Sequence, residues 1–343
     1  MFTKTFKEIT KKDVGIAGGK GASLGEMTRL LQGYSGRGSS SNPVPPGFVI
    51  LASAFDRFLE ETDFGVEIAS LLKKINYKDL NSVDAASYQI RDLIHDVPMP
   101  KDLAKIFLSE FKKLKTKFIA VRSSATAEDS AVASWAGELE TYLNTTEKNL
   151  LENIKKCWSS LFTQRALFYA FEKQVFTKKH QQKIRAGTSK MKDSYPVSVA
   201  VVVQKMVQSE ISGVCFTAHP VTEDKNQMVI EAGYGLGEAI VSGQITPDTY
   251  VVDKRDFSIA DINFSEQSRM IVKKKSEGVE WKPVAKNKKN QQKLTGKQII
   301  ELAKLCVRLE KHYKHPQDIE WALEKGKLYI TQSRPITTLQ AGK

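Results

Sequence analysis

The 343-residue sequence predicts an α+β fold, because apolar residues at helical spacing are interleaved with short apolar stretches typical of strands. Apolar residues make up 41% of the chain and charged residues 27%, near the averages of globular domains. This balance excludes global disorder and a coiled-coil or collagen-like chain. At roughly 150 residues per domain, the length allows two compact units or one large two-lobed one.

Helices are predicted where apolar residues recur every three or four positions. In chain order these residues are Leu24, Met27 and Leu31; then Phe55, Phe58 and Leu59; then Leu151, Ile154, Trp158, Leu161 and Phe162. A last helix is expected from about residue 296 to residue 313. Thr295 and Gln298 form a capping-box pattern at its start.

Strands are predicted at short apolar stretches that are bounded by turn residues. They cover residues 48–51, 118–122, 198–207, 214–217, 228–232 and 249–253. Three stretches rich in Gly, Ser, Pro or Lys are predicted to be loops or insertions, at residues 33–46, 178–196 and 269–297.

No apolar stretch approaches the roughly 20 residues that span a bilayer. Residues 1–10 lack the apolar core of a secretory signal, so we expect a cytoplasmic protein with no membrane partner. The three cysteines, Cys157, Cys215 and Cys306, lie far apart and form no C-x-x-C pair. This spacing argues against a disulfide framework and against a zinc site.

The formal net charge of +13 is concentrated in one segment. Residues 269–297 contain ten Lys or Arg residues and two Glu residues. A basic surface can bind nucleic acid, but this segment has a single aromatic residue, Trp281, and no motif that reads a groove. We therefore favour a solvated lysine-rich segment and expect no nucleic-acid partner, with polyanion binding as the alternative.

A glycine-rich motif, Gly18-Gly19-Lys20-Gly21, precedes the first predicted helix. Glycines at this position let backbone amides face an anion at a helix N-terminus, and the lysine adds a positive charge. The spacing differs from the Walker phosphate loop, which has four residues before Gly-Lys and then Ser or Thr. The motif resembles a phosphate loop, and an ordinary glycine turn is the alternative.

Two further motifs carry residues suited to phosphate or metal. A predicted strand delivers Arg122 into a hydroxyl-rich stretch, 123–130, where a guanidinium can meet phosphate oxygens; an exposed turn is the alternative. Residues 233–237 are glycine-rich but lack the third glycine of the dinucleotide fingerprint. Glu231 and Glu238 flank this stretch and are suited either to a metal or substrate or to plain solvent exposure.

The last motif is a predicted β-hairpin with strands at residues 318–323 and 328–334. Side chains alternate between the two faces of a strand. Asp318, Glu320 and Ala322 are therefore expected on one face of the first strand, and Ile330, Gln332 and Arg334 on one face of the second.

The pairing of the two strands depends on the length of the turn. With residues 325–327 as the loop, Glu320 lies opposite Gln332, and Asp318 lies opposite Arg334. Two carboxylates, a carboxamide and a guanidinium then converge, and this set suits Mg²⁺ and a phosphate group. A half-exposed hairpin with cross-strand salt bridges is the alternative.

Eight stretches of the sequence occur in the order found in one protein family. They are G-G-K-G-A-S-L-G-E-M (18–27), V-P-P-G-F-V-I (44–50), A-V-R-S-S-A-T-A-E-D-S (120–130), A-G-E-L-E-T-Y-L-N (136–144), V-V-V-Q-K-M-V (201–207), G-V-C-F-T-A-H-P-V-T (213–222), G-Y-G-L-G-E-A-I-V-S-G (233–243), and P-Q-D-I-E-W-A (316–322) with Q-S-R-P (332–335). Together they resemble the N-terminal nucleotide-binding domain of phosphoenolpyruvate synthase, which pyruvate phosphate dikinase and rifampicin phosphotransferase share. The resemblance covers essentially the whole chain.

The resemblance implies an ATP-grasp-like fold, in which residues 1–343 form one domain of two lobes that enclose ATP and Mg²⁺. The lobes are expected at about residues 1–195 and 196–340. The implied nucleotide-binding residues are Lys20, Arg122, Gly137, Thr141, Gln204, Asp318, Glu320, Gln332 and Arg334. Among them, Glu320 and Gln332 would bind Mg²⁺, and Lys20, Arg122 and Arg334 would be catalytic.

The implied activity is the transfer of a phosphoryl-containing group from ATP to a histidine on a separate swivelling domain. The sequence lacks the family's Thr-Ser-His-Ala segment and its pyruvate-binding barrel. The histidine is therefore expected on another domain or protein, and pyruvate is expected to enter only through such further domains. The alternatives are a rifampicin-phosphotransferase-like enzyme and an ATP-binding module without turnover.

Overall fold

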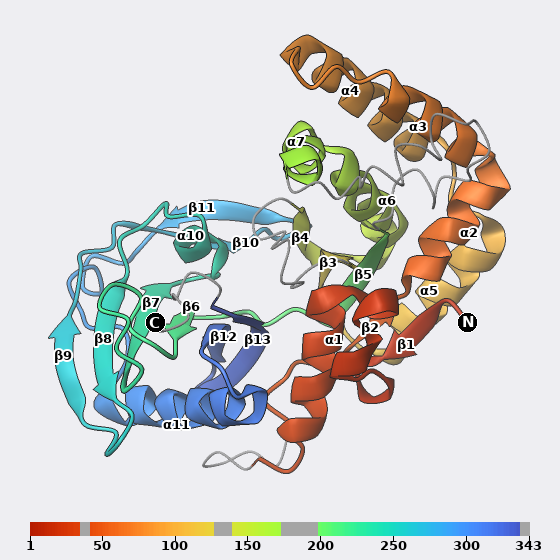
Figure 1. Cartoon of the computed structure of the whole chain (residues 1–343). Helices are drawn as coiled ribbons and strands as arrows, with labels where there is room; N and C mark the ends of the chain where they lie inside the picture. Colours follow the sequence, from red (N-terminus) through yellow and green to blue (C-terminus); the bar gives the residue numbers. More distant parts are fainter. Residues whose placement is uncertain (35–41, 127–138, 173–197, 337–343) are drawn as a thin grey trace. The chain divides into compact units, whose positions relative to one another are not determined.

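The computed structural model describes residues 1–34, 42–126, 139–172 and 198–336 (Figure 1). The chain divides into two compact units, each described here by itself. Unit 1 comprises Met1–Glu26 and Pro46–Lys205, and unit 2 comprises Met27–Pro45 and Met206–Lys343. Helices and sheets occur in both units, which confirms the α+β class. The expected lobe boundary at residue 195 falls outside the described residues, so the two-lobe division stays a prediction.

Unit 1 is built on a five-stranded antiparallel sheet. Its strands lie in the order β1 (Thr3–Thr5), β2 (Gly47–Ile50), β5 (Val199–Lys205), β3 (Ile119–Ala125) and β4 (Thr141–Thr145). The helices of this part of the chain are α1 (Val14–Leu30), α2 (Ala52–Thr62), α3 (Phe64–Lys73), α4 (Leu80–Asp96), α5 (Lys101–Lys113), α6 (Leu150–Ser159) and α7 (Gln164–Glu172). The end of α1, from Met27, belongs to unit 2.

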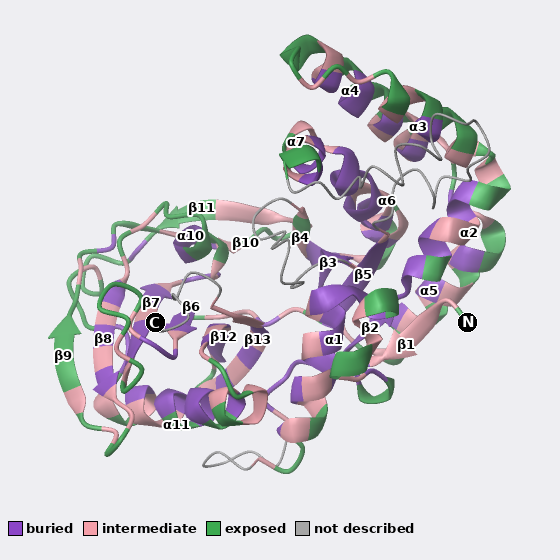
Figure 2. Cartoon of the chain, viewed as in Figure 1, coloured by how far each residue is buried: buried purple, intermediate pink, exposed green. Residues whose placement is uncertain are grey.

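The two faces of this sheet differ in composition. Alternate residues of β3 and β5, such as Val121 and Val203, are fully buried in the hydrophobic core with α2 and α6 (Figure 2). The residues between them, including Arg122 and Gln204, point to the opposite face because side chains alternate along a strand. The polar candidates of unit 1 therefore lie on the face away from the helical core.

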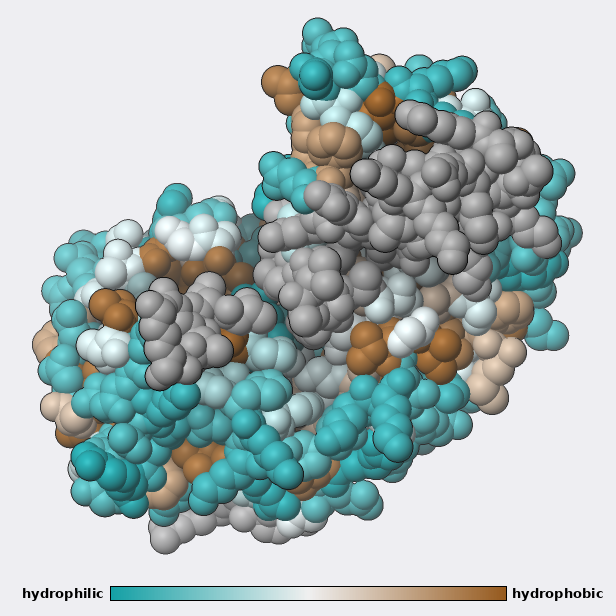
Figure 3. Space-filling model, viewed as in Figure 1, coloured by the Kyte–Doolittle hydropathy of each residue, from teal (hydrophilic) through white to brown (hydrophobic). Residues whose placement is uncertain are grey.

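Unit 2 is built on a six-stranded antiparallel sheet. Its strands lie in the order β13 (Lys327–Pro335), β12 (Gln317–Glu324), β6 (Ile211–Phe216), β7 (Gln227–Tyr234), β8 (Asp248–Asp253) and β9 (Ile259–Asn263). Helix α11 (Gly296–Tyr313) packs against β7, β8 and β12, and the short helix α10 (Glu238–Val241) follows β7. The apolar stripe of α11 is buried, whereas the surface around this helix is largely hydrophilic (Figure 3).

The capping box predicted at the start of α11 is confirmed. The Gln298 N–H donates to the Thr295 hydroxyl at 3.4 Å, and the Thr295 N–H donates to Gln298 Oε1 at 2.9 Å. Replacing Thr295 with Ala removes one half of the box, so we expect Thr295→Ala to lower the free energy of unfolding by about 1 kcal/mol. Chemical denaturation measures this change. Thr295→Ser keeps the hydroxyl and is the control; equal stability of the Ala and Ser variants would contradict the prediction.

Most basic residues of the lysine-rich segment are exposed, as expected, but the segment is not a plain loop. It forms a two-stranded ribbon of β10 (Arg269–Lys273) and β11 (Val279–Pro283), and Ile271 within it is buried. Lys293 is fully buried and pairs with the equally buried Asp248 at 2.7 Å. The loop prediction is wrong here because β-branched residues sustain a ribbon and a buried carboxylate compensates the buried ammonium.

The other two predicted loops fall partly or wholly outside the described residues, which omit 35–41 and 173–197. Within the described parts of the chain, no helix is both long enough and apolar enough to cross a membrane.

Candidate functional site

Helix α1 is interrupted at Gly18, two residues before Lys20. Gly18 has φ 69° and ψ 170°, so the helix restarts after it. A Cβ atom at Gly18 would lie 2.2 Å from Ser124 Oγ and 2.3 Å from the Ser124 carbonyl oxygen. Glycine is required there both for the left-handed φ and for the close approach of two backbones. The amides of the restarted helix and the Lys20 ammonium form the kind of N-terminus that favours an anion.

Three predicted site residues of unit 1 share one face of its sheet. Arg122 pairs with Thr141 on β4 and with Val202 on β5, and directly opposite residues share a face. Gln204 follows Val202 by two positions and therefore lies on the same face. Arg122 and Gln204 are buried, whereas Thr141 is exposed.

The glycine-rich turn of α1 lies on this same face. A Cβ atom at Gly21 would lie 3.1 Å from Val49 Cγ2, and Val49 pairs with Val202. Unit 1 thus brings Lys20 and its loop to the face of Arg122, Thr141 and Gln204. Gly137, the remaining predicted residue of this group, lies outside the described residues.

In unit 2, the predicted pairing of the hairpin is confirmed. Glu320 lies opposite Gln332, and Asp318 lies opposite Arg334. Arg334 Nε donates to Asp318 Oδ2 at 2.8 Å, and Arg334 Nη2 forms an ion pair with the same oxygen at 2.8 Å. This charge-assisted contact fixes the guanidinium beside the Glu320 and Gln332 pair.

The pairing of Glu320 with Gln332 does not come from the expected three-residue loop at residues 325–327. The turn has two residues, Lys325 and Gly326, both with positive φ, as two-residue hairpin turns require. A bulge at Thr331 then adds one residue to β13 and restores the pairing of Glu320 with Gln332. The prediction that Ile330 shares a face with Gln332 and Arg334 is therefore wrong: Ile330 pairs with Trp321, which lies on the other face of β12 from Glu320, and both are buried.

The acidic residues of this face influence one another. Burial raises the pKa of Asp318, while Arg334 acts in the opposite direction and Glu320 raises the pKa further.

Glu231 on β7 lies opposite Val214, which on its other side lies opposite Glu320. Burial and the Asp318 charge raise the pKa of Glu231. The sequence left the role of Glu231 open; the structure places it half-buried on the face of Glu320, about 10 Å away at two strand spacings.

These residues fit a magnesium ion that is shared with a phosphate group. Glu320 and Gln332 supply hard oxygen ligands from adjacent strands. Among the described residues, no group of three or more His, Cys, Asp or Glu side chains is placed to hold a metal. Mg²⁺ commonly takes one or two protein oxygens and completes its shell with phosphate oxygens and water, so this donor set suits it.

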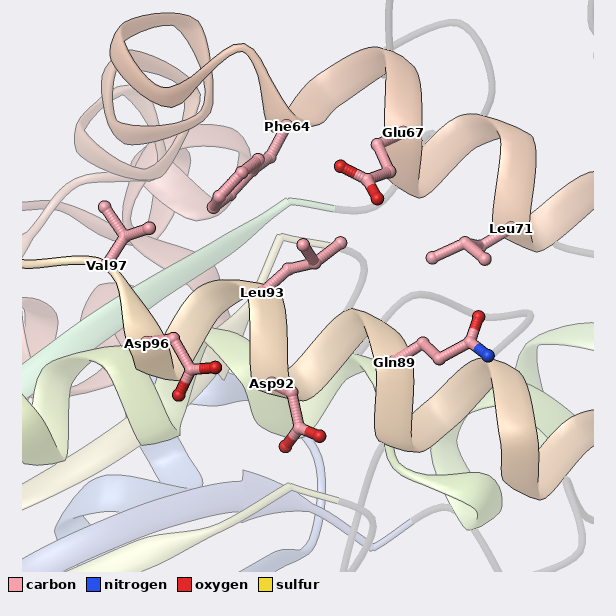
Figure 4. Close-up of a pocket in the computed structure, with 8 residues that line it drawn as sticks. All are labelled: Phe64, Glu67, Leu71, Gln89, Asp92, Leu93, Asp96 and Val97. Atoms are coloured by element: carbon pink, nitrogen blue, oxygen red, sulfur yellow. The ribbon is translucent and has the colours of Figure 1, made fainter.

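A surface pocket between α3 and α4 is lined by none of the predicted site residues (Figure 4). Glu67 on α3 and Asp92 and Asp96 on α4 line it, together with Phe64 and other apolar side chains. Three carboxylates would repel a triphosphate. This pocket is therefore not the site for a nucleotide.

Ser124 is the residue that the sequence-based reasoning missed. It is fully buried, and its hydroxyl bonds to the glycine-rich turn of α1. The signal was present in the alternation of β3, because Ser124 follows Arg122 by two positions and shares its face.

Known proteins match nearly the whole chain. The family described as "Pyruvate phosphate dikinase, AMP/ATP-binding domain" matches residues 14–343. A probable phosphoenolpyruvate synthase of Methanocaldococcus jannaschii is 42% identical over 100% of this chain and 27% of its own length. The phosphoenolpyruvate synthase of Pyrococcus furiosus is 38% identical over 99% of this chain and 44% of its own length. A rifampicin phosphotransferase of Bacillus cereus is 37% identical over 98% of this chain and 36% of its own length. The chain thus spans less than half the length of each of these relatives.

Proposed function

The chain belongs to the pyruvate phosphate dikinase AMP/ATP-binding domain family, and on that premise we propose that it binds MgATP and transfers a phosphoryl-containing group to a histidine on a separate domain. The proposed fold is ATP-grasp, with two lobes enclosing the nucleotide. The proposed system converts pyruvate to phosphoenolpyruvate, as the names of two relatives suggest. The histidine and the pyruvate site would belong to further domains, in cis or in trans, and the proposed location is the cytoplasm.

The pairing of Glu320 with Gln332, beside the bond from Arg334 to Asp318, is the observation that carries this proposal. Glu320 and Gln332 would hold Mg²⁺, which when bound neutralises charge on the phosphate oxygens. Arg334, positioned by Asp318, would contact the phosphate end of the nucleotide.

The residues on the polar face of the unit 1 sheet would bind the rest of the nucleotide. Lys20 and Arg122 would hold phosphate oxygens, and Gln204 would lie near the adenine. Thr141, the first residue of β4, and Gly137 would also contact the phosphates. Phosphoryl transfer requires mainly positioning and charge neutralisation, so Lys20, Arg122 and Arg334 would supply most of the catalysis and no general base is assigned.

The experiment that tests this function supplies the chain with ATP, Mg²⁺ and a histidine-bearing domain from a phosphoenolpyruvate synthase. We expect AMP to form only when all components are present, with the β- and γ-phosphoryl groups transferred together to the histidine; hydrolysis that releases one phosphate would then leave the histidine phosphorylated. Nucleotide binding without AMP formation would overturn the transfer and support an ATP-binding module without turnover.

The 37% identity to a rifampicin phosphotransferase favours a second candidate, in which the same nucleotide chemistry serves an antibiotic acceptor. The phosphorylated histidine domain distinguishes the two. Transfer to pyruvate supports the synthase, whereas transfer to rifampicin supports the phosphotransferase.

A further inference from the structure

We propose that Ser124 is a positioning residue that holds Lys20 in a fixed relation to Arg122. This inference rests on the proposed function, in which these two residues hold the phosphates of ATP. Ser124 itself is fully buried and would not touch the nucleotide. Its role would be exerted through the glycine-rich turn.

The Ser124 hydroxyl is inserted into the hydrogen-bond ladder of α1. In an uninterrupted helix, the Gly21 N–H would donate to the Ala17 carbonyl oxygen. Here the Gly21 N–H donates to Ser124 Oγ at 3.2 Å, and Ser124 Oγ donates to the Ala17 carbonyl oxygen at 3.0 Å. One hydroxyl can donate and accept at the same time, so it bridges the break that Gly18 introduces.

Lys20 lies in the segment between the two residues that the Ser124 hydroxyl joins. Ala17 and Gly21 flank the segment of Gly18, Gly19 and Lys20, and both of its ends are bonded to the same side-chain oxygen. The close approach of Gly18 to the Ser124 backbone removes the space in which this segment could move toward β3, and the two hydrogen bonds oppose movement away from it. The backbone of Lys20 is therefore tied to Ser124.

Strand β3 carries both Ser124 and Arg122. Arg122 and Ser124 are two residues apart on one face; Arg122 pairs with both β4 and β5, and Ser124 pairs with Ala200 on β5. Pairing with the neighbouring strands restricts the backbone of β3 and with it the spacing of these two residues. The Ser124 hydroxyl thus fixes the backbone position from which the Lys20 side chain extends, and this position is fixed relative to Arg122.

The test compares Ser124→Ala with Ser123→Ala. Ser123 is equally buried on the same strand, but its hydroxyl faces the helical side, where it donates to the Glu140 and Cys157 carbonyl oxygens and bonds Ser160 Oγ. Both variants lose the hydrogen bonds of a buried hydroxyl on β3. Only Ser124→Ala also loses the bridge between Ala17 and Gly21. Ser124→Cys, which keeps the side-chain volume with a weaker donor, is a third variant in case the alanine variant does not fold.

Two readouts are measured on the full chain. The first is backbone amide hydrogen exchange of the peptide that covers residues 17–21. The second is the kcat and KM for ATP of AMP formation with the histidine-bearing domain supplied. We expect faster exchange in Ser124→Ala, and a loss of kcat of about 100-fold, the order caused by misplacing a group by 1 Å, with a smaller change in KM.

We expect Ser123→Ala to match the wild type in both readouts, and Ser124→Cys to fall between Ser124→Ala and the wild type. Equal kcat in the two alanine variants, or unchanged exchange at residues 17–21 in Ser124→Ala, would overturn the positioning role. If the wild type forms no AMP, the proposed function fails, and the exchange comparison alone then decides whether Ser124 restrains the turn.

Discussion

Replacing Glu320 with Ala is expected to lower the affinity for ATP in the presence of Mg²⁺ by about 100-fold or more, because loss even of a group that supports a metal ligand costs 10- to 100-fold. Glu320 is the carboxylate of the pair that faces Gln332. Without it, a carboxamide alone would remain at this position for the ion, and a carboxamide carries no charge to offset that of Mg²⁺. Calorimetric titration with ATP at several Mg²⁺ concentrations measures the effect.

The matched control is Glu324→Ala. Glu324 lies on the same strand, at its turn end opposite Lys327, and its removal changes the net charge by the same amount. We expect this control to bind ATP like the wild type and to keep its dependence on Mg²⁺. An equal loss in both variants would point to a general charge effect, and unchanged Mg²⁺-dependent binding in Glu320→Ala would remove the proposed metal site.

Replacing Gly18 with Ala is expected to destabilise unit 1 by about 3 kcal/mol or more, from the combined cost of a left-handed φ and of overpacking. The added Cβ would lie 2.2 to 2.5 Å from the hydroxyl, carbonyl oxygen and carbonyl carbon of Ser124. Two of these atoms are backbone atoms of β3, which pairs with Ala200 of β5 at this residue, so they cannot give way as a flexible side chain would. Denaturant titration of the free energy of unfolding measures the loss.

Gly15→Ala in the same helix is the control, and its expected effect has the opposite sign. A Cβ atom at Gly15 has no neighbour within 4 Å, and Gly15 has no positive φ. Alanine there is expected to stabilise the protein by about 0.5 to 1 kcal/mol, because it restricts the unfolded chain and favours the helix. If both variants were equally stable, the close approach of α1 to β3 would be refuted.

The hairpin shows which features of the structure can be predicted from alternation along a strand and which cannot. Alternation along the strands predicted correctly that Asp318 and Glu320 share a face, and that Gln332 and Arg334 lie opposite them. The assumed three-residue loop was wrong, and its error was offset by the bulge at Thr331. A bulge depends on how two strands pack and twist, so composition and spacing do not reveal it.

Several strands were not predicted because their sequences lack the apolar pattern that is typical of a strand. The short strands β1 and β4 and the exposed edge strand β9 have no clear apolar alternation. The basic composition of residues 269–297 gave no sign of the ribbon of β10 and β11 or of the buried ion pair between Lys293 and Asp248, two residues 45 positions apart. Packing against the rest of the unit stabilises such elements, and tertiary context then outweighs propensity.

Sequence alone determined the fold class, most of the central strands and the shared face of the polar hairpin residues, because the period of a helix or strand fixes the direction of its side chains. Tertiary structure alone decided which distant groups meet. The Ser124 hydroxyl enters the broken ladder of α1 from 103 residues away, and Glu231 takes its place on the face of Glu320 through the order of the strands. Local periodicity contains no information on such pairings, since they arise only when the sheets assemble.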